Sequence, residues 1–232
     1  MNSSGPEGWH RAMIRVLQKT KEFDTFDLVR PPTDRNIVGS RLVFARKQDG
    51  TQKARWVAQG FSQSNGLDYG ETFSPVCRIG SVRLILALAN KKDWPVYHMY
   101  DTNAFLKSPV GPYEVYVKQS PGSIQIDPKA GEEYVCKLKR SLYGLLNSSL
   151  NWFNTLNDAL RKIVFIPLAS HQCVLVLRQC SDQIIVTIRV DDNLLTGNNP
   201  ELITEVKSSL HERFLVKDLG EVSKITRHSH CS

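Results

Sequence analysis

The sequence predicts an α+β fold in which a small antiparallel sheet packs on helices. With residues 108–148 left out, the segments with strand and helix character from residue 96 onward follow in the order strand, helix, strand, strand, helix. An Asp-Gly pair between two β-prone runs near residue 50 adds a hairpin in the N-terminal half. With 41% hydrophobic and 23% charged residues the chain has the composition of a globular protein, so we expect a packed core.

The N-terminal half begins with a helix and continues with strands. Apolar residues recur at helical spacing near the start of the chain, at Trp9, Ala12, Met13, Val16 and Leu17. A short strand should follow and end at Pro31-Pro32. Residues 41–47 and 53–58 then form the two strands of the hairpin, joined at Asp49-Gly50. In the second of these strands, alternation places Lys53 and Arg55 on one face.

The remaining elements are predicted from their periodicity and from cap signals. Ser81 should cap a helix over residues 82–90, and strands should follow at 96–101 and 113–117. An amphipathic helix is expected over residues 149–163. Strands at 173–177 and 183–190 come next, joined by a Ser-Asp turn. Asn199 as cap and Pro200 as first helical residue should open a last helix.

Charge and cysteine content narrow the functional classes. The net charge is +7, and residues 1–95 hold 15 Lys+Arg against 9 Asp+Glu, which suits a surface that faces polyanions or an ordinary basic surface. Five scattered cysteines without a CxxC pair predict reduced, mostly buried thiols. Without a signal peptide or an apolar run of about 20 residues, we expect a soluble intracellular protein, cytoplasmic or nuclear, that makes no membrane contact.

The adjacent carboxylates of Asp191 and Asp192, which follow a predicted strand, are the most informative local feature of the sequence. Adjacent carboxylates repel each other, and a cation would neutralise the repulsion. Oxygen ligands at an open site suit Mg²⁺, which bridges to substrate phosphates. Asp-Asp pairs are also common in ordinary turns, so the pair alone does not establish a metal site.

Several motifs distributed along the chain indicate a protein family more specifically than the Asp-Asp pair alone does. They are KARWVAQGF at 53–61, ETFSPVCR at 71–78, AFL at 104–106, SLYGL at 141–145, VTIRVDD at 186–192 and KDLGE at 217–221. From Trp9 to Glu221 the chain resembles the reverse transcriptase of copia-type LTR retrotransposons, the RNA-dependent DNA polymerase domain of a Pol polyprotein. The resemblance implies the fingers and palm of that fold, without its thumb.

The resemblance also implies a site and its ligands. Asp191 and Asp192 would hold catalytic Mg²⁺ in a two-metal site together with a carboxylate on the first palm strand. Lys53 and Arg55 would contact the incoming dNTP, and Phe105 would lie beneath its sugar. The partners would be an RNA template, a DNA primer and dNTP. Without the resemblance, a solvated strand face would explain Lys53 and Arg55, and ordinary core packing would explain Phe105.

Several positions depart from the family pattern. In an ungapped match to the AFL motif, Tyr100 occupies the catalytic Asp position and Asp101 falls one residue later. A shift of one residue turns a strand side chain to the opposite face, so Asp101 can serve only through a bulge or a deletion. Residues 146–152 lack the Lys, Gln, Pro and Arg of the template-side motif, and Arg189 replaces a Tyr. These changes predict an impaired, incomplete two-metal site.

The resemblance divides the chain into five parts. The bounds expected are 1–95 for the N-terminal part of the fingers, 96–107 for the first palm strand, 108–148 for an insertion that belongs to the fingers, 149–221 for the palm, and 222–232 for an aberrant tail. The sequence does not predict an oligomeric state.

Three functions remain open at this stage. The first is a catalytically impaired remnant that binds nucleic acid weakly, and the sequence favours it. The second is an active reverse transcriptase that uses Asp101, Asp191 and Asp192. The third is a non-catalytic interaction module adopted by the host.

Overall fold

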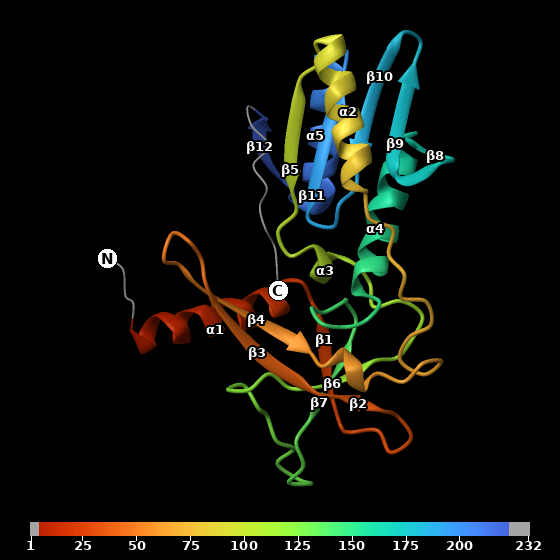
Figure 1. Cartoon of the computed structure of the whole chain (residues 1–232). Helices are drawn as coiled ribbons and strands as arrows, with labels where there is room; N and C mark the ends of the chain where they lie inside the picture. The colour runs from red at the N-terminus through yellow and green to blue at the C-terminus, as the bar shows by residue number, and fades with distance from the viewer. Residues whose placement is uncertain (1–4, 223–232) are drawn as a thin grey trace. The chain divides into compact units, whose positions relative to one another are not determined.

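The computed structural model of the chain describes residues 5–222 and divides into two compact units. Unit 1 comprises Met1–Ser74 and Phe105–Thr155, and unit 2 comprises Pro75–Ala104 and Leu156–Ser232. The chain therefore leaves unit 1, returns to it, and leaves it again. Each unit is α+β, as the sequence predicts, and the elements are labelled in Figure 1.

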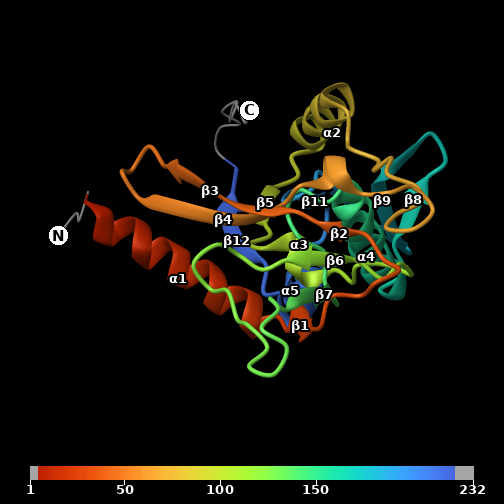
Figure 2. The same cartoon turned by 90° about the horizontal axis from the view of Figure 1, so that it is seen from below.

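The first part of unit 1 is a helix against a two-stranded ribbon. Helix α1 (Pro6–Glu22) lies alongside the antiparallel pair β3 (Ser40–Arg46) and β4 (Gln52–Ala58), as Figures 1 and 2 show. Trp9 of α1 meets Phe44 of β3 edge to face, with 5.3 Å between ring centroids. The predicted helix and hairpin are both confirmed, because periodicity and turn chemistry are local signals.

The second part of unit 1 is a four-stranded sheet. Its strand order is β1-β7-β6-β2, antiparallel except for the pair β6 and β2. The bounds are Phe26–Val29 for β1, Ile37–Val38 for β2, Tyr116–Lys118 for β6 and Val135–Leu138 for β7. Trp56 of the hairpin joins the hydrophobic core of this sheet and meets Phe26 edge to face. Two short helical segments complete the unit, η1 (Gly60–Ser62) and α3 (Ala104–Lys107), which begins at the boundary.

Unit 2 is built on a six-stranded antiparallel sheet of order β12-β5-β11-β10-β9-β8. The bounds are Val96–Tyr100 for β5, Ile166–Leu168 for β8, His171–Gln179 for β9, Asp182–Thr187 for β10, Asp192–Gly197 for β11 and Lys217–Glu221 for β12. The sequence analysis did not predict three of these strands: β11, which lies between β5 and β10, and β8 and β12, which lie at the two edges. Edge strands pair on one side only, and short ones carry a weak alternation signal.

Three helices accompany this sheet: α2 (Ile79–Lys92), α4 (Ser148–Lys162), which begins in unit 1, and α5 (Pro200–Phe214). Figures 1 and 2 show α2 and α5 on opposite sides of the sheet. Helix α5 begins as predicted, because the Asn199 side chain accepts hydrogen bonds from the N–H groups of Glu201 and Leu202, each at 3.0 Å.

The predicted start of α2 was wrong. Ser81 does not cap the helix but lies in its first turn, and its N–H donates to the carbonyl oxygen of Arg78 at 2.9 Å. Arg78 is the N-cap residue, with an extended backbone and without a side-chain cap bond. The tertiary structure therefore outweighed the cap preference of serine, which is worth only about 1 kcal/mol.

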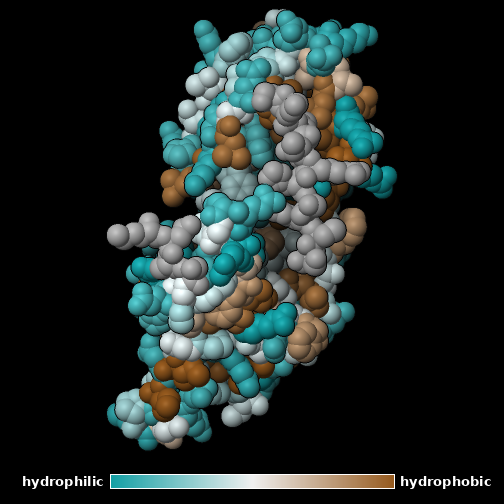
Figure 3. Space-filling model, turned by 60° about the vertical axis from the view of Figure 1, so that its left-hand side comes forward, coloured by the Kyte–Doolittle hydropathy of each residue, from teal (hydrophilic) through white to brown (hydrophobic). Residues whose placement is uncertain are grey.

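Hydrophobic side chains are distributed as in an ordinary folded domain. The largest fully buried side chains include Trp56, Trp152 and Phe165. On the face shown in Figure 3, hydrophobic residues form separate patches among hydrophilic ones.

None of the helices within residues 5–222 has the length and apolar character needed to cross a membrane. The expected aberrant tail, apart from Val222, lies outside the described residues.

Candidate active site

The Asp191-Asp192 pair lies at a hairpin in unit 2, opposite the end of β5. In the ladder between β5 and β11, the Cα partner of Asp192 is Tyr100. One residue further, the N–H of Asp101 donates to the carbonyl oxygen of Asp191 at 2.8 Å. Paired residues of an antiparallel ladder point to the same face. The two acidic residues of the hairpin therefore lie opposite different residues: Asp192 opposite Tyr100, and Asp191 opposite Asp101.

The hairpin between β10 and β11 turns tightly. The N–H of Asp192 donates to the carbonyl oxygen of Arg189 at 2.9 Å, which places Val190 and Asp191 at the centre of the turn. Val190 has a φ of 51°, in the left-handed region that disfavours β-branched residues. A positive φ at the first central position alone is the pattern of a type II′ turn, where glycine is usual. The surrounding ladder holds Val190 in a conformation that costs on the order of 1–3 kcal/mol.

Asp192 has a partner that the sequence analysis missed. The Nε2 atom of His98 lies 3.0 Å from Oδ1 of Asp192, and the two side chains are 33% and 46% exposed. His98 and Tyr100 are two residues apart on β5 and so share one face with Asp192. That spacing was the signal available in the sequence, but it becomes informative only once the pairing of β5 with β11 is known.

Asp101 is placed differently from Asp192. Its side chain is fully buried, with 0% exposure. On β5, the ring of Tyr97 lies 3.2 Å from Nζ of Lys207 on α5, so Tyr97 faces that helix. Strand alternation puts Met99, 2% exposed, on the same side as Tyr97, and His98 and Tyr100 on the other. Strand β5 ends at Tyr100, so Asp101 lies one residue beyond it; if the alternation continued by that residue, the Asp101 side chain would lie on the side of α5.

The arrangement can be tested against the needs of a divalent metal. Within residues 5–222, no three side chains from His, Cys, Asp and Glu are grouped so that they could hold a metal ion. Asp192 is half-exposed and hydrogen-bonded to His98, whereas Asp101 is buried. Hard cations such as Mg²⁺ require several oxygen ligands in near-octahedral geometry. Within the described residues, Asp101, Asp191 and Asp192 therefore do not form a ready group of three metal ligands.

Lys53 and Arg55 lie in unit 1, on one face of β4. Both are half-buried, while their neighbours Gln52, Ala54 and Trp56 are buried. The buried face is the one that α1 covers, because Trp9 of α1 contacts Phe44 of β3, whose ladder partner on β4 is the buried Ala54. Lys53 and Arg55 therefore project away from α1.

Arg55 and Phe105 meet at a common aromatic residue. The guanidinium carbon of Arg55 lies 5.9 Å from the centre of the Tyr143 ring, within the range of a cation–π contact. The Phe105 ring meets the same tyrosine edge to face, with 4.8 Å between centroids. Helix α3 and the SLYGL motif are thereby joined to β4. Phe105 is half-buried, so it is neither wholly core nor wholly surface.

Gly144 allows the SLYGL segment to lie directly on β4. Its φ is +88°, and a Cβ atom there would lie 2.2 Å from the carbonyl oxygen of Ala58. The N–H of Ala58 donates to the carbonyl oxygen of Tyr143 at 2.7 Å. A glycine is required here both for the backbone conformation and for the close approach. This contact fixes the ring of Tyr143 beside Arg55.

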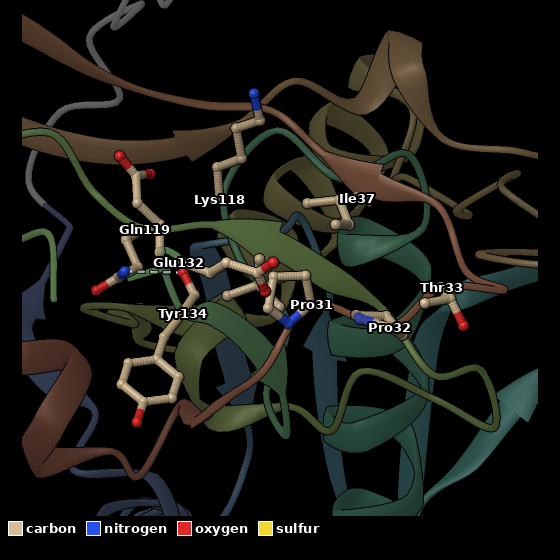
Figure 4. A pocket seen from close by; sticks show the side chains of 10 residues that line it. Pro31, Pro32, Thr33, Ile37, Lys118, Gln119, Glu132 and Tyr134 are labelled. Atoms are coloured by element: carbon tan, nitrogen blue, oxygen red, sulfur yellow. Dashed lines mark hydrogen bonds between the residues drawn. The ribbon is translucent and has the colours of Figure 1, made fainter. Parts of the chain in front are cut away.

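A pocket of about 470 Å³ lies elsewhere in unit 1 (Figure 4). Its lining residues are Pro31, Pro32, Thr33, Ile37, Lys118, Gln119, Glu132, Glu133, Tyr134 and Val135. Gln119 Nε2 donates to the carbonyl oxygens of Gln125 and Tyr134, at 2.9 and 2.8 Å. The side-chain amide of Gln119 therefore holds the loop between β6 and β7 in place. None of the site residues predicted from the sequence lines this pocket.

Within residues 5–222, the thiols have no arrangement that suggests catalysis. Of the cysteines in the described part of the chain, Cys77, Cys136 and Cys173 are buried, Cys180 is exposed, and all four are free. Burial raises the pKa of the Cys136 thiol to about 12 and that of Cys173 to about 11. A thiol is a poor nucleophile when its pKa is raised in this way.

The chain belongs to the reverse transcriptase (RNA-dependent DNA polymerase) family, whose model matches residues 23–227. It is a domain of the retrotransposon Pol polyprotein type.

Its relatives include retrotransposon polyproteins of plants. The chain is 38% identical over 222 residues to the retrovirus-related Pol polyprotein from transposon RE1 of Arabidopsis thaliana, covering 93% of this chain and 15% of that protein. It is 32% identical over 221 residues to the corresponding polyprotein from transposon TNT 1-94 of Nicotiana tabacum, covering 93% of this chain and 16% of that protein. The chain thus spans about a sixth of the length of these relatives. Among solved structures, prototype foamy virus protease-reverse transcriptase aligns with a TM-score of 0.47 and 12% identity, over 92% of this chain and 24% of that one.

Proposed function

We propose that this chain is a catalytically impaired remnant of an RNA-directed DNA polymerase domain. The observation that carries the proposal is the pairing of Tyr100 with Asp192. Tyr100 stands where the family motif calls for a catalytic carboxylate, and a phenol is not a ligand that Mg²⁺ prefers. Residues 1–95 and 108–148 would be the fingers of this domain, and residues 96–107 and 149–221 its palm.

The chemistry explains why one missing carboxylate matters. Polymerisation by the two-metal mechanism requires ions about 4 Å apart, one at the attacking oxygen and one at the leaving oxygen. Carboxylates that share such ions must converge on them from one side. Asp101 is fully buried, whereas Asp192 is half-exposed and bonded to His98. This difference in exposure opposes a shared metal site.

Weak binding of nucleic acid is the activity we propose to persist. Lys53 and Arg55 lie on the face of β4 turned away from α1. Unit 1 contains 17 Lys+Arg against 12 Asp+Glu, so its net charge favours polyanions. The ligands would be an RNA template with a DNA primer, bound without sequence preference at roughly micromolar strength or weaker in physiological salt.

Primer extension on an RNA template, with Mg²⁺ and separately with Mn²⁺, tests the proposal. The expected result is no extension by the folded protein beyond that of a D191N/D192N control. A wild-type signal that exceeds the control would show that the catalytic site is intact.

An active polymerase that uses Asp101, Asp191 and Asp192 is the second candidate. The hydrogen bond of 2.8 Å between the backbones of Asp101 and Asp191 favours it, because the two residues are opposite each other. Under this candidate, D101N would abolish extension and Y100F would leave it unchanged. Under the remnant proposal neither substitution has any activity to remove.

A further inference from the structure

The loop of residues 59–74 in unit 1 is held by buried polar side chains. Asp68 is 1% exposed and accepts hydrogen bonds from Asn36 Nδ2 at 2.6 Å and from the N–H of Ser64 at 2.7 Å. The same amide of Asn36 donates to the carbonyl oxygen of Ser62 at 2.7 Å. Hydrogen bonds to a buried carboxylate are stronger than neutral ones. The loop therefore has a defined conformation.

A second set of contacts joins this loop to the SLYGL segment. Gln63, 8% exposed, accepts a hydrogen bond from the N–H of Leu146 at 2.8 Å. Gly60 lies so close to Gly144 that a Cβ atom on Gly60 would be 2.2 Å from the carbonyl oxygen of Gly144. The backbone on both sides of Phe61 is thus fixed against the segment that carries Tyr143.

Two phenylalanines of residues 59–74 project into solvent: Phe61, on the backbone that these contacts fix, and Phe73, five residues beyond Asp68. Phe61 is 84% exposed and Phe73 is 81% exposed, more than any other large hydrophobic residue among those the structure describes. Burying a phenylalanine side chain is worth about 1.5–3 kcal/mol, and neither ring gains this within the chain. The free energy of burying these two exposed rings therefore remains for a ligand to gain.

The neighbourhood of Phe61 points to a nucleic acid as that ligand. Phe61 follows the end of β4 by three residues, and β4 carries Lys53 and Arg55. Arg55 in turn lies over the Tyr143 ring. Cations that attract phosphates, combined with aromatic rings on which bases stack, are the arrangement by which proteins bind single strands. Every base has a flat face, so stacking tolerates any sequence.

We propose that Phe61 and Phe73 are stacking contacts for unpaired bases, so that this domain prefers single-stranded nucleic acid to duplex. The inference rests on the proposed residual binding and specifies its mode. Stacking supplies affinity that does not depend on salt, while Lys53 and Arg55 supply the part that does. The surface requires neither a metal ion nor a primer end.

The test compares three fluorescently labelled ligands by anisotropy: a single-stranded RNA of 12 nucleotides, the corresponding RNA–DNA hybrid, and an abasic strand of equal length. The variants are F61A, F73A and the double variant, with L84A as the matched control. Leu84 is 71% exposed and belongs to unit 2, so L84A removes a comparable exposed apolar side chain. Circular dichroism establishes that each variant is folded.

We expect each phenylalanine substitution to weaken binding of the single strand roughly 5- to 150-fold. Binding of the abasic strand by the wild type should already be weak, and F61A should not weaken it further. L84A should bind all three ligands as the wild type does.

Three other outcomes would overturn the inference, and they differ in whether they also refute the proposed nucleic-acid binding. Equal binding of single strand by wild type and F61A/F73A would refute stacking and leave the proposed nucleic-acid binding intact. Absence of binding to all three ligands by folded wild type would refute both. Self-association that F61A/F73A abolishes, with unchanged nucleic-acid binding, would assign the rings to a second copy of the chain.

Discussion

Tyr100 stands directly opposite Asp192 in the ladder between β5 and β11. The Nε2 atom of His98, on the same face of β5, lies 3.0 Å from the Asp192 carboxylate. The neighbours of this carboxylate are thus a phenol and an imidazole, and the acid that follows, Asp101, is fully buried. The first prediction follows from this pairing.

The double substitution Y100D/D101V should create Mg²⁺ affinity that the wild type lacks. Opposite residues of an antiparallel pair have Cβ atoms about 4.5–5.5 Å apart, so a carboxylate at position 100 would share a face with Asp192. Isothermal titration with Mg²⁺, and Mn²⁺ binding followed by electron paramagnetic resonance, would measure the gain. Primer extension should stay absent, because residues 146–152 still lack the cations of the family motif.

Its control is Y100N/D101V, which has similar size and no charge at position 100. Equal affinity in both double variants would contradict the assignment of Tyr100 to the ligand position.

The second prediction concerns the cations of β4. K53A/R55A should weaken nucleic-acid binding and make the slope of log K against log salt shallower by about 1.4 for a single strand, since each lost phosphate contact removes about 0.7. R55K should keep the slope and lose part of the affinity, because lysine cannot stack on Tyr143 as a planar guanidinium does. K129A serves as a control for loss of an exposed cation in the same unit. An unchanged slope in K53A/R55A would place the binding surface elsewhere.

The third prediction concerns the contact between the SLYGL segment and β4. G144A should destabilise the protein by more than about 2 kcal/mol, because a positive φ and a steric overlap act together. G131A is the matched control: Gly131 has a φ of +70°, but its Cβ would meet nothing within 4 Å. The control should cost only about 1 kcal/mol, from the backbone conformation. Urea unfolding measures both, and equal costs would show that the overlap is relieved by a small backbone shift.

The fourth prediction is a pH dependence at Asp127. The N–H of Lys129 donates to its carboxylate at 2.8 Å and Arg30 donates at 2.7 Å, and these contacts hold the pKa of Asp127 below its ordinary value of 3.8. A carboxyl whose pKa is lower in the folded state stabilises the protein above its ordinary pKa, and the stabilisation is lost as pH falls through the folded-state pKa. D127N should therefore be less stable than wild type at pH 7, and the difference should shrink below about pH 4.

Chemical denaturation at several pH values would measure this difference. D34N is the control, since the Asp34 side chain is 81% exposed. A difference between D127N and wild type that stays constant down to pH 2 would contradict the role of Asp127.

Much of the fold could be predicted because its signals are local. Helix α1, the β3–β4 hairpin and the capped start of α5 follow from periodicity, from Asp49-Gly50 and from Asn199-Pro200. Strand β12 could not be predicted in this way. It pairs with β5, more than 100 residues away in sequence, and its residues are mostly exposed. A strand of that kind depends on a partner that a local window does not contain.

By itself the sequence determined the family of this protein, the order of its main elements and the presence of carboxylates at the hairpin, because these depend on motifs and short-range spacing. The pairing partners of those carboxylates were decided by the tertiary structure. Register between strands is set by packing over the whole sheet, and one residue of register moves a side chain to the other face. Thus Asp192 lies opposite Tyr100 and contacts His98, while Asp101, the residue that follows Tyr100, is buried. The exposure of Phe61 and Phe73 likewise depends on a loop held by Asn36, Asp68 and Leu146, which only the folded chain brings together.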